Sequence, residues 1–219
     1  MKNILAACLF LAPFPAFSAA DVPFDRAMAV AYDLLGAEVS SPFCQPTSIT
    51  QEQRDRLVLA LGSVTTPGLS DETGLTPLDY AVFADDVPSI KRFLTLGYRL
   101  NSRDIHESTP LHGAALLGSV RALNFLLASG SDPNSSNNAG FTPLMAAVLG
   151  DRADIARSLL AAGASVTSRT TDGHTILHYA LTCRDEPLIK LLLAAGAEPD
   201  DKARELATKF GINLAPAER

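Results

Sequence analysis

The apolar residues between about residue 71 and residue 201 return in a fixed pattern along the chain. A Thr-Pro-Leu or Thr-Ile-Leu triplet begins at four equally spaced positions, which are Thr76, Thr109, Thr142 and Thr175. Each triplet leads into an alanine-containing stretch, then into a pair of large apolar residues, and then into a glycine. A fixed period of about 33 residues predicts a repeat protein, in which each unit buries its apolar face against the next unit.

One copy of the pattern predicts two helices followed by a turn. Threonine before proline is typical of a helix start, because the hydroxyl caps free backbone N–H groups and proline at the first helical position loses no needed donor. Small alanines keep this first helix thin, so that neighbouring units can approach closely. The large apolar pair belongs to a second helix, which ends at the glycine. The polar residues that follow, such as 131–140, are expected to form a turn.

The full pattern is Asp/Asn-x-x-Gly-x-Thr-Pro-Leu-His, followed by Ala and by Leu-Leu-x-x-Gly-Ala, and it covers residues 71–201. It resembles the ankyrin-repeat family. The resemblance implies an all-α solenoid of helix-turn-helix repeats with β-turn fingers. We expect four repeats, at residues 71–100, 101–136, 137–169 and 170–201. The resemblance also implies that the rings of His112 and His178 bond to the backbone of a turn.

A few positions depart from the family pattern. Gly118 ends the first helix of the second repeat, and the equivalent positions of the other repeats hold Asp85, Asp151 and Arg184. Glu107 replaces the glycine in the turn of the second repeat. A glycine at the end of a helix adopts the left-handed conformation, which aspartate tolerates moderately and arginine poorly. We therefore expect some backbone strain in the fourth repeat.

The segments on either side of the repeats predict helical caps, because the terminal units of a repeat stack need a polar outer face. Residues 21–70 are expected to form an N-terminal cap, with one helix over 23–36 and another that opens with the capping box Thr50-Gln51-Glu52-Gln53. Residues 202–219 begin a helix too early for a fifth repeat, since six residues of turn are missing. We expect a C-terminal cap helix that ends at Gly211, followed by a loose tail.

Residues 1–20 have the pattern of a secretory signal peptide. One lysine precedes an apolar run of about 14 residues, Ile4 to Phe17, and Ser18-Ala19-Ala20 offers a cleavage site of small residues. The run is too short to span a bilayer. A lipoprotein signal ending at Cys8 is disfavoured, because no apolar core precedes that cysteine. Since ankyrin proteins of eukaryotes are mostly intracellular, we expect an exported bacterial protein that is periplasmic or secreted.

Removal of the signal peptide would leave two cysteines, Cys44 ahead of the first repeat and Cys183 in the fourth. Helices that pack about 8–10 Å apart would place three repeats between them. The Cα atoms of a disulfide lie within about 7 Å of each other. The sequence therefore predicts two thiols that are not joined, and it shows no Cys-x-x-Cys or His/Cys cluster that would indicate a metal.

The charge and the motifs of the chain exclude several functions. The net charge is −6, or −7 without residues 1–20, and phosphate binding needs clustered Lys and Arg, so nucleic acid and anionic lipid are not expected partners. His174 and His178 have the spacing of a helical zinc site, but Thr175 begins the helix between them and leaves His174 outside it. No Gly-x-Ser-x-Gly motif, phosphate-binding glycine loop or isolated carboxylate pair is present. We expect neither an enzyme nor a cofactor.

The resemblance implies that partners contact the turn tips and the exposed side of the first helix in each repeat. Large apolar residues at these positions predict an exposed stripe over the first three repeats, with His106 beside it: Leu75, Phe83, Ile105, Leu116, Leu117, Phe141 and Leu149. The equivalent positions of the fourth repeat are polar. For Leu116 and Leu149, packing between the helices is an equally good interpretation.

Two functions fit these expectations. In the first, a monomeric interaction module binds a partner through a preformed concave face and neutralises or supports it, the partner being a toxin, in an immunity role, or a periplasmic enzyme. Exported ankyrin proteins that resemble this chain include immunity proteins and accessory factors of periplasmic enzymes. In the second, the chain is a secreted bacterial effector that binds host proteins. The neighbouring gene would distinguish the two functions.

Overall fold

A computed structural model gives the fold of residues 49–214. In this part of the chain the regular structure is helical, apart from one isolated bridge between Arg169 and Thr175. The ten helices of these residues are α3 (Gln51–Leu61), α4 (Pro77–Phe83), α5 (Val87–Thr95), α6 (Pro110–Leu117), α7 (Val120–Ala128), α8 (Pro143–Leu149), α9 (Ala153–Ala161), α10 (Ile176–Cys183), α11 (Glu186–Ala194) and α12 (Asp201–Phe210). The expected all-α repeat fold is confirmed for residues 49–214.

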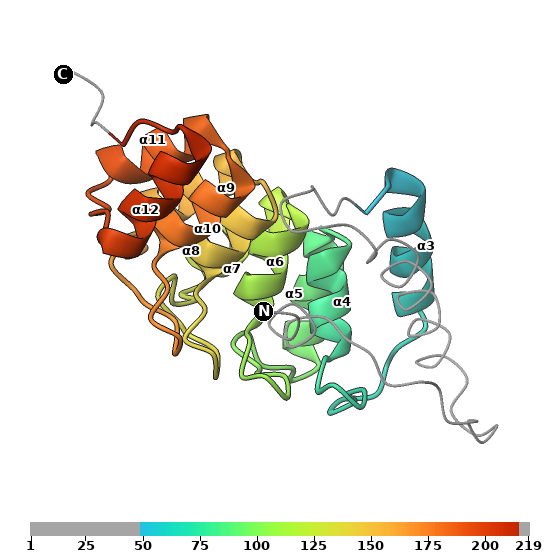
Figure 1. Cartoon of the computed structure of the whole chain (residues 1–219). Helices are drawn as coiled ribbons and strands as arrows, with labels where there is room; N and C mark the ends of the chain where they lie inside the picture. The colour runs from blue at the N-terminus through green and yellow to red at the C-terminus, as the bar shows by residue number, and fades with distance from the viewer. Residues whose placement is uncertain (1–48, 215–219) are drawn as a thin grey trace.

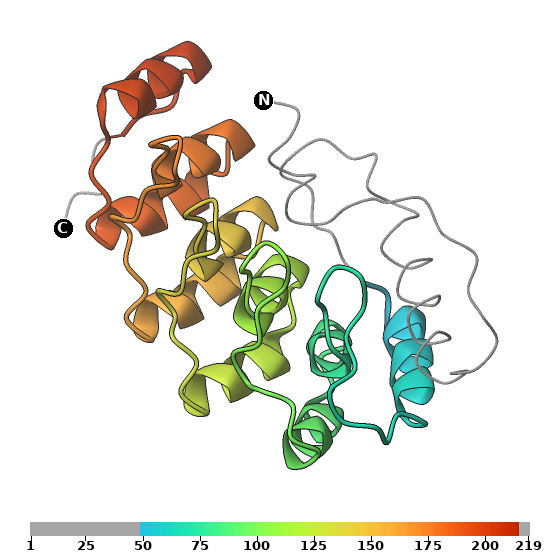
Figure 2. The ribbon, with the colours of Figure 1, turned by 90° about the horizontal axis from the view of Figure 1, so that it is seen from below.

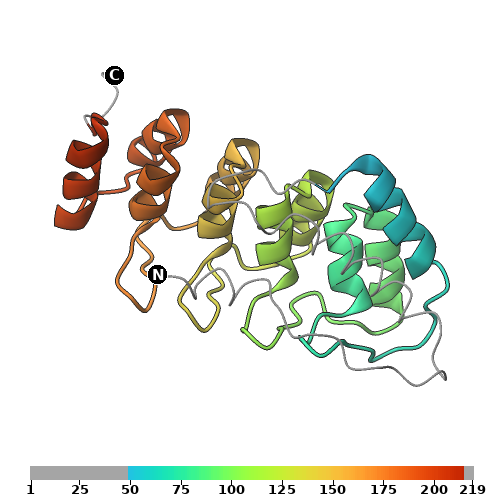
Figure 3. The same cartoon turned by 45° about the vertical axis from the view of Figure 1, so that its right-hand side comes forward.

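The helices of the repeats form two layers. Helices α4, α6, α8 and α10 begin at equal intervals along the chain and pack side by side in that order, and we call them the inner helices. Helices α5, α7, α9 and α11 begin at the same equal intervals, and we call them the outer helices. Figure 1 and Figure 3 show the resulting row of helix pairs, from which the turns between the repeats project to one side.

The inner helices start at the predicted threonines, each of which has an extended backbone just before its helix: Thr76, Thr109, Thr142 and Thr175. At Thr142 the hydroxyl accepts a hydrogen bond from the N–H of Met145 (3.4 Å). A capping box is present at the other three threonines. In these boxes the threonine N–H donates to the side chain three residues further on, which is Asp79 (2.8 Å), His112 (3.1 Å) or His178 (3.0 Å).

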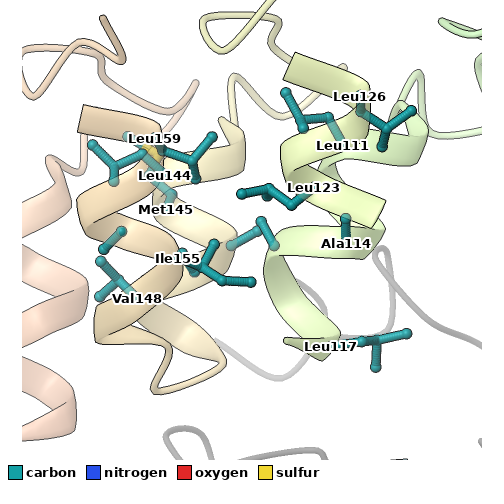
Figure 4. Close-up of a cluster of buried hydrophobic side chains, with 14 of the residues drawn as sticks. Leu111, Ala114, Leu117, Leu123, Leu126, Leu144, Met145, Val148, Ile155 and Leu159 are labelled. Atoms are coloured by element: carbon teal, nitrogen blue, oxygen red, sulfur yellow. The ribbon is translucent and has the colours of Figure 1, made fainter. Parts of the chain in front are cut away.

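The hydrophobic core lies between the two layers and between neighbouring repeats. Figure 4 shows part of it, where α6 to α9 contribute the almost completely buried side chains of Leu111, Leu123, Leu126, Leu144, Met145, Ile155 and Leu159. Of each predicted large apolar pair, only the first member is fully buried, namely Phe93, Leu126, Leu159 and Leu192, while the second is half-buried. Because these side chains meet across repeat boundaries, each repeat depends on its neighbours for its core.

The residues that follow three of the inner helices adopt the left-handed conformation without being glycine. Asp85, Asp151 and Arg184 have φ angles of 56°, 54° and 55°, close to the 76° of Gly118, so the expected conformation is confirmed. The guanidinium carbon of Arg184 lies 4.4 Å from the centre of the Phe210 ring in α12. This cation–π contact helps to hold the arginine in a conformation that it adopts poorly on its own.

One further helix lies at each end of the row (Figure 1). Helix α3 packs on α4 with Leu57 and Leu61 buried, and the capping box predicted at Thr50 is present. Helix α12 packs on α10 with Ala207 buried, and it ends at Gly211, which has a φ of 69°. Both predicted helices therefore exist, and their role as caps of the stack stays a prediction.

Four expected features lie outside the described residues. They are the signal peptide at 1–20, the helix over 23–36, Cys44, and the tail at 215–219. They stay predictions. Within residues 49–214, every helix is too short or too polar to cross a membrane.

Candidate protein-binding surface

The four turns that precede the inner helices share one hydrogen-bond pattern. The N–H of the first residue donates to the carbonyl four residues further on over 2.9–3.1 Å, in the pairs Asp71 to Leu75, Asp104 to Ser108, Asn137 to Phe141 and Thr170 to His174. The side chain of that first residue also accepts backbone N–H groups of its own turn over 2.7–3.1 Å. These bonds hold each turn in one shape before any partner arrives.

Backbone hydrogen bonds also join each turn to the next. The N–H of Ile105 donates to the Thr73 carbonyl (2.9 Å), and the N–H of Asn138 donates to the His106 carbonyl (3.0 Å). The N–H of Thr171 completes the series by donating to the Ala139 carbonyl (2.9 Å). The turns therefore form a continuous row, which Figure 2 shows from below and Figure 3 from the side.

One position in each turn carries an exposed side chain at the tip. These positions follow the same period as the helices and hold Glu72, Ile105, Asn138 and Thr171. Ile105 is the large apolar residue of this series, and its side chain is 59% exposed. Glu107, two residues on, has a φ of 63° and so takes over the conformation of the glycine that it replaces. The placement of Ile105 on an exposed tip is as expected.

Leu75 and His106 lie half-buried in the turns rather than fully exposed. The N–H of Leu75 donates to Asp71 Oδ1 (2.9 Å), and the N–H of His106 donates to Asp104 Oδ1 (2.8 Å). Burial raises the pKa of Asp104, although the hydrogen bonds from Ser108 and His106 oppose this effect. Both backbones are fixed, and parts of both side chains remain open to a partner.

Three residues of the expected stripe are buried, so their predicted exposure is wrong. Phe83, Leu117 and Phe141 are only 6%, 3% and 4% exposed. The ring of Phe83 fills the space beside Gly113, where a Cβ atom would collide with it. The ring of Phe141 packs edge-to-face on Tyr179, with 5.3 Å between the ring centres. The pattern of the repeat gives the positions of these residues, but it does not show that the neighbouring helix leaves room to bury them.

Leu116 and Leu149 lie near the C-terminal ends of α6 and α8, and both are half-buried. They pack against the core and keep part of their surface open, so each of the two interpretations holds in part. Gly150 follows Leu149, and a Cβ atom there would collide with the carbonyl of Leu116. The ends of these two inner helices therefore approach each other closely.

His112 joins the second repeat to the turn of the third. Its Nδ1 accepts bonds from the N–H (3.1 Å) and the hydroxyl (2.9 Å) of Thr109, which leaves the proton of the neutral ring on Nε2. The Nε2–H group of His112 donates to the carbonyl of Phe141 (3.0 Å), so the expected bond to a turn is confirmed. Burial lowers the pKa of His112 to about 4 and keeps the ring neutral near pH 7.

His178 makes the same contacts to Thr175 but lacks the second bond. Its Nε2 has no hydrogen-bond partner within residues 49–214 and lies 3.6 Å from a carboxylate oxygen of Asp200. The shortened connection after the fourth repeat explains this difference, because no further turn supplies a carbonyl at that place. Burial lowers the pKa of His178, and the charge of Asp200 opposes that shift.

Cys183, the last residue of α10, is joined in a disulfide, so the expectation of an unjoined thiol is wrong there. The prediction rested on the separation of Cys44 and Cys183 by three repeats, and Cys44 lies outside the described residues.

Comparison with known protein families defines the class of repeat. Residues 111–203, from α6 to the start of α12, match the sequence profile of ankyrin repeats in three copies. The helices within these residues, α6 to α11, therefore form ankyrin repeats. The first repeat lies outside the matched residues, but α4 and α5 keep the same spacing and the same capping box. The search of curated proteins gave no match.

Ankyrin repeats are generally non-catalytic modules that bind other proteins, and this is the general function that residues 111–203 indicate. Within the described part of the chain, no group of three or more His, Cys, Asp or Glu side chains is placed to hold a metal ion. The candidate surface therefore consists of the row of turns and the open parts of the inner-helix ends.

Proposed function

We propose that the chain is an exported protein-interaction module that binds one partner protein and thereby neutralises or supports it. The partner is a toxin, in an immunity role, or a periplasmic enzyme, and the module acts as a monomer. Binding uses the row of turns and the concave side formed by the inner helices. The observation that carries this proposal is the row of turns joined by backbone hydrogen bonds, because a surface that is already ordered loses little entropy when a partner binds.

Ile105 is the anchor of the proposed contact. A single exposed apolar residue is common on protein surfaces, but the backbone of Ile105 is bonded to the neighbouring turn, which fixes the place from which its side chain projects. The half-open side chains of Leu75 and His106 lie in the same row of turns and would form the surroundings of the anchor. The buried Phe83, Leu117 and Phe141 take no part in this contact.

Two observations support export. Residues 1–20 have the pattern of a signal peptide, and Cys183 is joined in a disulfide, a bond that persists in oxidising compartments and is rare in the cytosol. We expect the mass of the native protein to place its N-terminus at Asp21 or within a few residues of it. A native protein that retains Met1 would contradict export.

An affinity-capture experiment tests the binding function. The full chain, Ile105→Arg and Leu59→Arg are immobilised and exposed to an extract of the native compartment, and the retained proteins are quantified by mass spectrometry. Leu59 is a matched control, because its side chain is 81% exposed and lies on α3, away from the turns. We expect the full chain and Leu59→Arg to retain one toxin or enzyme equally. Ile105→Arg should retain at most roughly one tenth of the amount of partner that the full chain retains, as expected for the loss of an anchor.

Equal retention of that partner by Ile105→Arg would contradict the assignment of the anchor. Loss of the partner with Leu59→Arg alone would place the contact on α3 and contradict the proposed surface. Retention of no toxin or enzyme by any of the three chains would contradict the proposed function.

A further inference from the structure

The charges of the repeats are divided between the turns and the outer helices. The four turns, at residues 71–75, 104–108, 137–141 and 170–174, contain no lysine or arginine and five acidic residues: Asp71, Glu72, Asp104, Glu107 and Asp172. The outer helices contain two acidic residues, Asp154 and Glu186, against five basic ones: Lys91, Arg92, Arg121, Arg157 and Lys190. The turns therefore carry an excess of negative charge, and the outer helices carry an excess of positive charge.

Two arginines beside the turns reduce the negative charge only in part. Arg103 stands directly before the second turn, and its Nη1 lies 3.5 Å from the carboxylate of Glu107. Arg169 stands directly before the fourth turn, and its Nη1 pairs with Asp200 over 3.0 Å. The first turn has no such arginine, and within residues 49–214 the carboxylate of Glu72 makes no ion pair. The uncompensated charge is therefore greatest at the first turn.

The first two turns form one continuous surface around Ile105. The N–H of Ile105 is bonded to the first turn, and a Cβ atom on Gly74 would approach the Cα of Asp104 to 3.1 Å, so the two backbones are in close contact. Glu72 and Ile105 occupy the same exposed position in the two turns, and Glu107 lies two residues beyond Ile105. The exposed apolar side chain therefore has one carboxylate in the neighbouring turn and another in its own turn.

The carboxyl groups of these two repeats repel one another. Burial raises the pKa of Asp104 against the opposing hydrogen bonds, and the charge of Asp71 raises it further. Burial also raises the pKa of Asp79 to about 6, and the charges of Asp104 and Asp71 add to that shift. A cation docked over the first two turns would relieve this repulsion, whereas an anion would increase it.

We propose that the partner docks a basic protein segment on the first two turns, with an apolar side chain against Ile105 and Lys or Arg side chains facing Glu72 and Glu107. This inference rests on the proposed function and adds the chemistry of the partner's contact surface. The apolar contact supplies affinity at the centre, and the surrounding charges select the partner. A nucleic acid would be repelled from the same turns, since phosphate binding needs clustered Lys and Arg.

The division of charge also orients the chain before contact. A basic partner is attracted to the turns and repelled by the outer helices, so it approaches the correct side. This attraction acts over about 10 Å at 0.1 M salt and weakens as salt is added. The rate of association should therefore depend on Glu72, on Glu107 and on salt more strongly than the rate of dissociation does.

An NMR titration with defined peptides tests the chemistry of the surface without the native partner. The full chain is titrated at low salt with the capped peptide Lys-Lys-Leu-Lys-Lys, and with control peptides in which the four lysines are glutamate or the leucine is glycine. We expect the first peptide to shift the amide signals of residues 71–75 and 104–108 and to bind at least roughly tenfold more tightly than either control. Equal binding of the glutamate peptide, or shifts confined to the outer helices, would overturn the proposal.

Matched variants test the carboxylates with the partner obtained by affinity capture. The double variant Glu72→Gln/Glu107→Gln removes both charges, and Glu186→Gln, on the exposed surface of α11, is the control. We expect the double variant to lower the association rate roughly tenfold at low salt and by less at high salt, with a change in dissociation rate below about twofold. The control should leave both rates unchanged. An association rate that is equal in the double variant and the full chain would contradict the proposal.

These outcomes are distinct from a failure of the proposed function. A captured toxin or enzyme whose association ignores the double variant would overturn the basic segment and leave the interaction module standing. Peptide binding at the first two turns without any captured toxin or enzyme would support the surface and contradict the proposed function. Light scattering that shows self-association of the full chain, lost in the double variant, would assign these turns to the outer helices of a second copy and overturn the proposal.

Discussion

One position of the repeat shows how a single side chain sets the local electrostatics. The residue three places after the capping threonine is Asp79, His112, Met145 and His178 in the four repeats. Asp79 Oδ2 accepts bonds from the N–H (2.8 Å) and the hydroxyl (2.7 Å) of Thr76, as the ring of His112 does from Thr109. Burial raises the pKa of Asp79 to about 6 and lowers that of His112 to about 4. Each shift widens the pH range in which that group is neutral.

These two shifts have opposite effects on stability as the pH changes. The folded state holds the proton of Asp79 more tightly than the unfolded state does, so its stabilising effect is present below about pH 4 and is lost as the pH rises through about 6. His112 resists protonation in the folded state, so its stabilising effect is present above about pH 6.5 and is lost as the pH falls towards about 4. In the intact chain the two effects partly cancel between these limits.

Replacing Asp79 with asparagine should separate the two effects. Asp79→Asn keeps an oxygen for the N–H of Thr76 but cannot ionise, so we expect it to raise the free energy of unfolding at pH 7.5 by up to roughly 3 kcal/mol, the equivalent of about two pKa units. At pH 4 the two proteins should be about equally stable. Urea unfolding at both pH values measures this, with the exposed Asp172→Asn as the control. A gain of the same size at both pH values would contradict the assigned role of burial.

The corrected position of Phe141 leads to a second residue-level prediction. Its ring is buried and packs on Tyr179, so Phe141→Ala should lower the free energy of unfolding by roughly 3–5 kcal/mol. Ile105→Ala, at an exposed tip, should change it by less than about 0.5 kcal/mol. Chemical denaturation of the two variants provides the comparison. If Phe141→Ala proved as stable as Ile105→Ala, the burial of that ring would be in doubt.

At the level of the elements, the sequence predicts the helices well because local signals define them. The threonines mark the starts of the inner helices, and the left-handed positions after α4 and α10 follow from their alignment with Gly118. The exposure of the stripe could not be predicted, because it depends on the space between two helices. Phe83 is buried because Gly113 leaves room for its ring, and a spacing rule does not contain that information.

The outer helices give a matched pair of variants that tests the core. Leu126 is fully buried whereas its neighbour Leu127 is only half-buried. Leu126→Ala should lower the free energy of unfolding by roughly 2–5 kcal/mol, because it removes apolar contact and leaves a cavity between repeats. Leu127→Ala should cost less than about 1.5 kcal/mol, since part of its side chain already meets solvent. If Leu127→Ala lowered the free energy of unfolding more than Leu126→Ala does, the assignment of Leu126 to the buried face of α7 would be wrong.

At the scale of the whole molecule, two kinds of interaction hold the row of repeats together. Apolar side chains join neighbouring repeats through the core, and backbone hydrogen bonds join their turns on one side. A stack that is held in this way presents the tips of its turns in fixed positions, and this is why we assign binding to that side.

The most direct test of the proposed binding surface is hydrogen exchange on the complex with the captured partner. Peptides that cover the turns at residues 71–75, 104–108 and 137–141 should exchange more slowly in the complex than in the unbound chain, whereas the outer helices α5, α7 and α9 should be unaffected. That outcome would place the partner on the row of turns around Ile105. Protection confined to the outer helices, with the turns unchanged, would contradict the account.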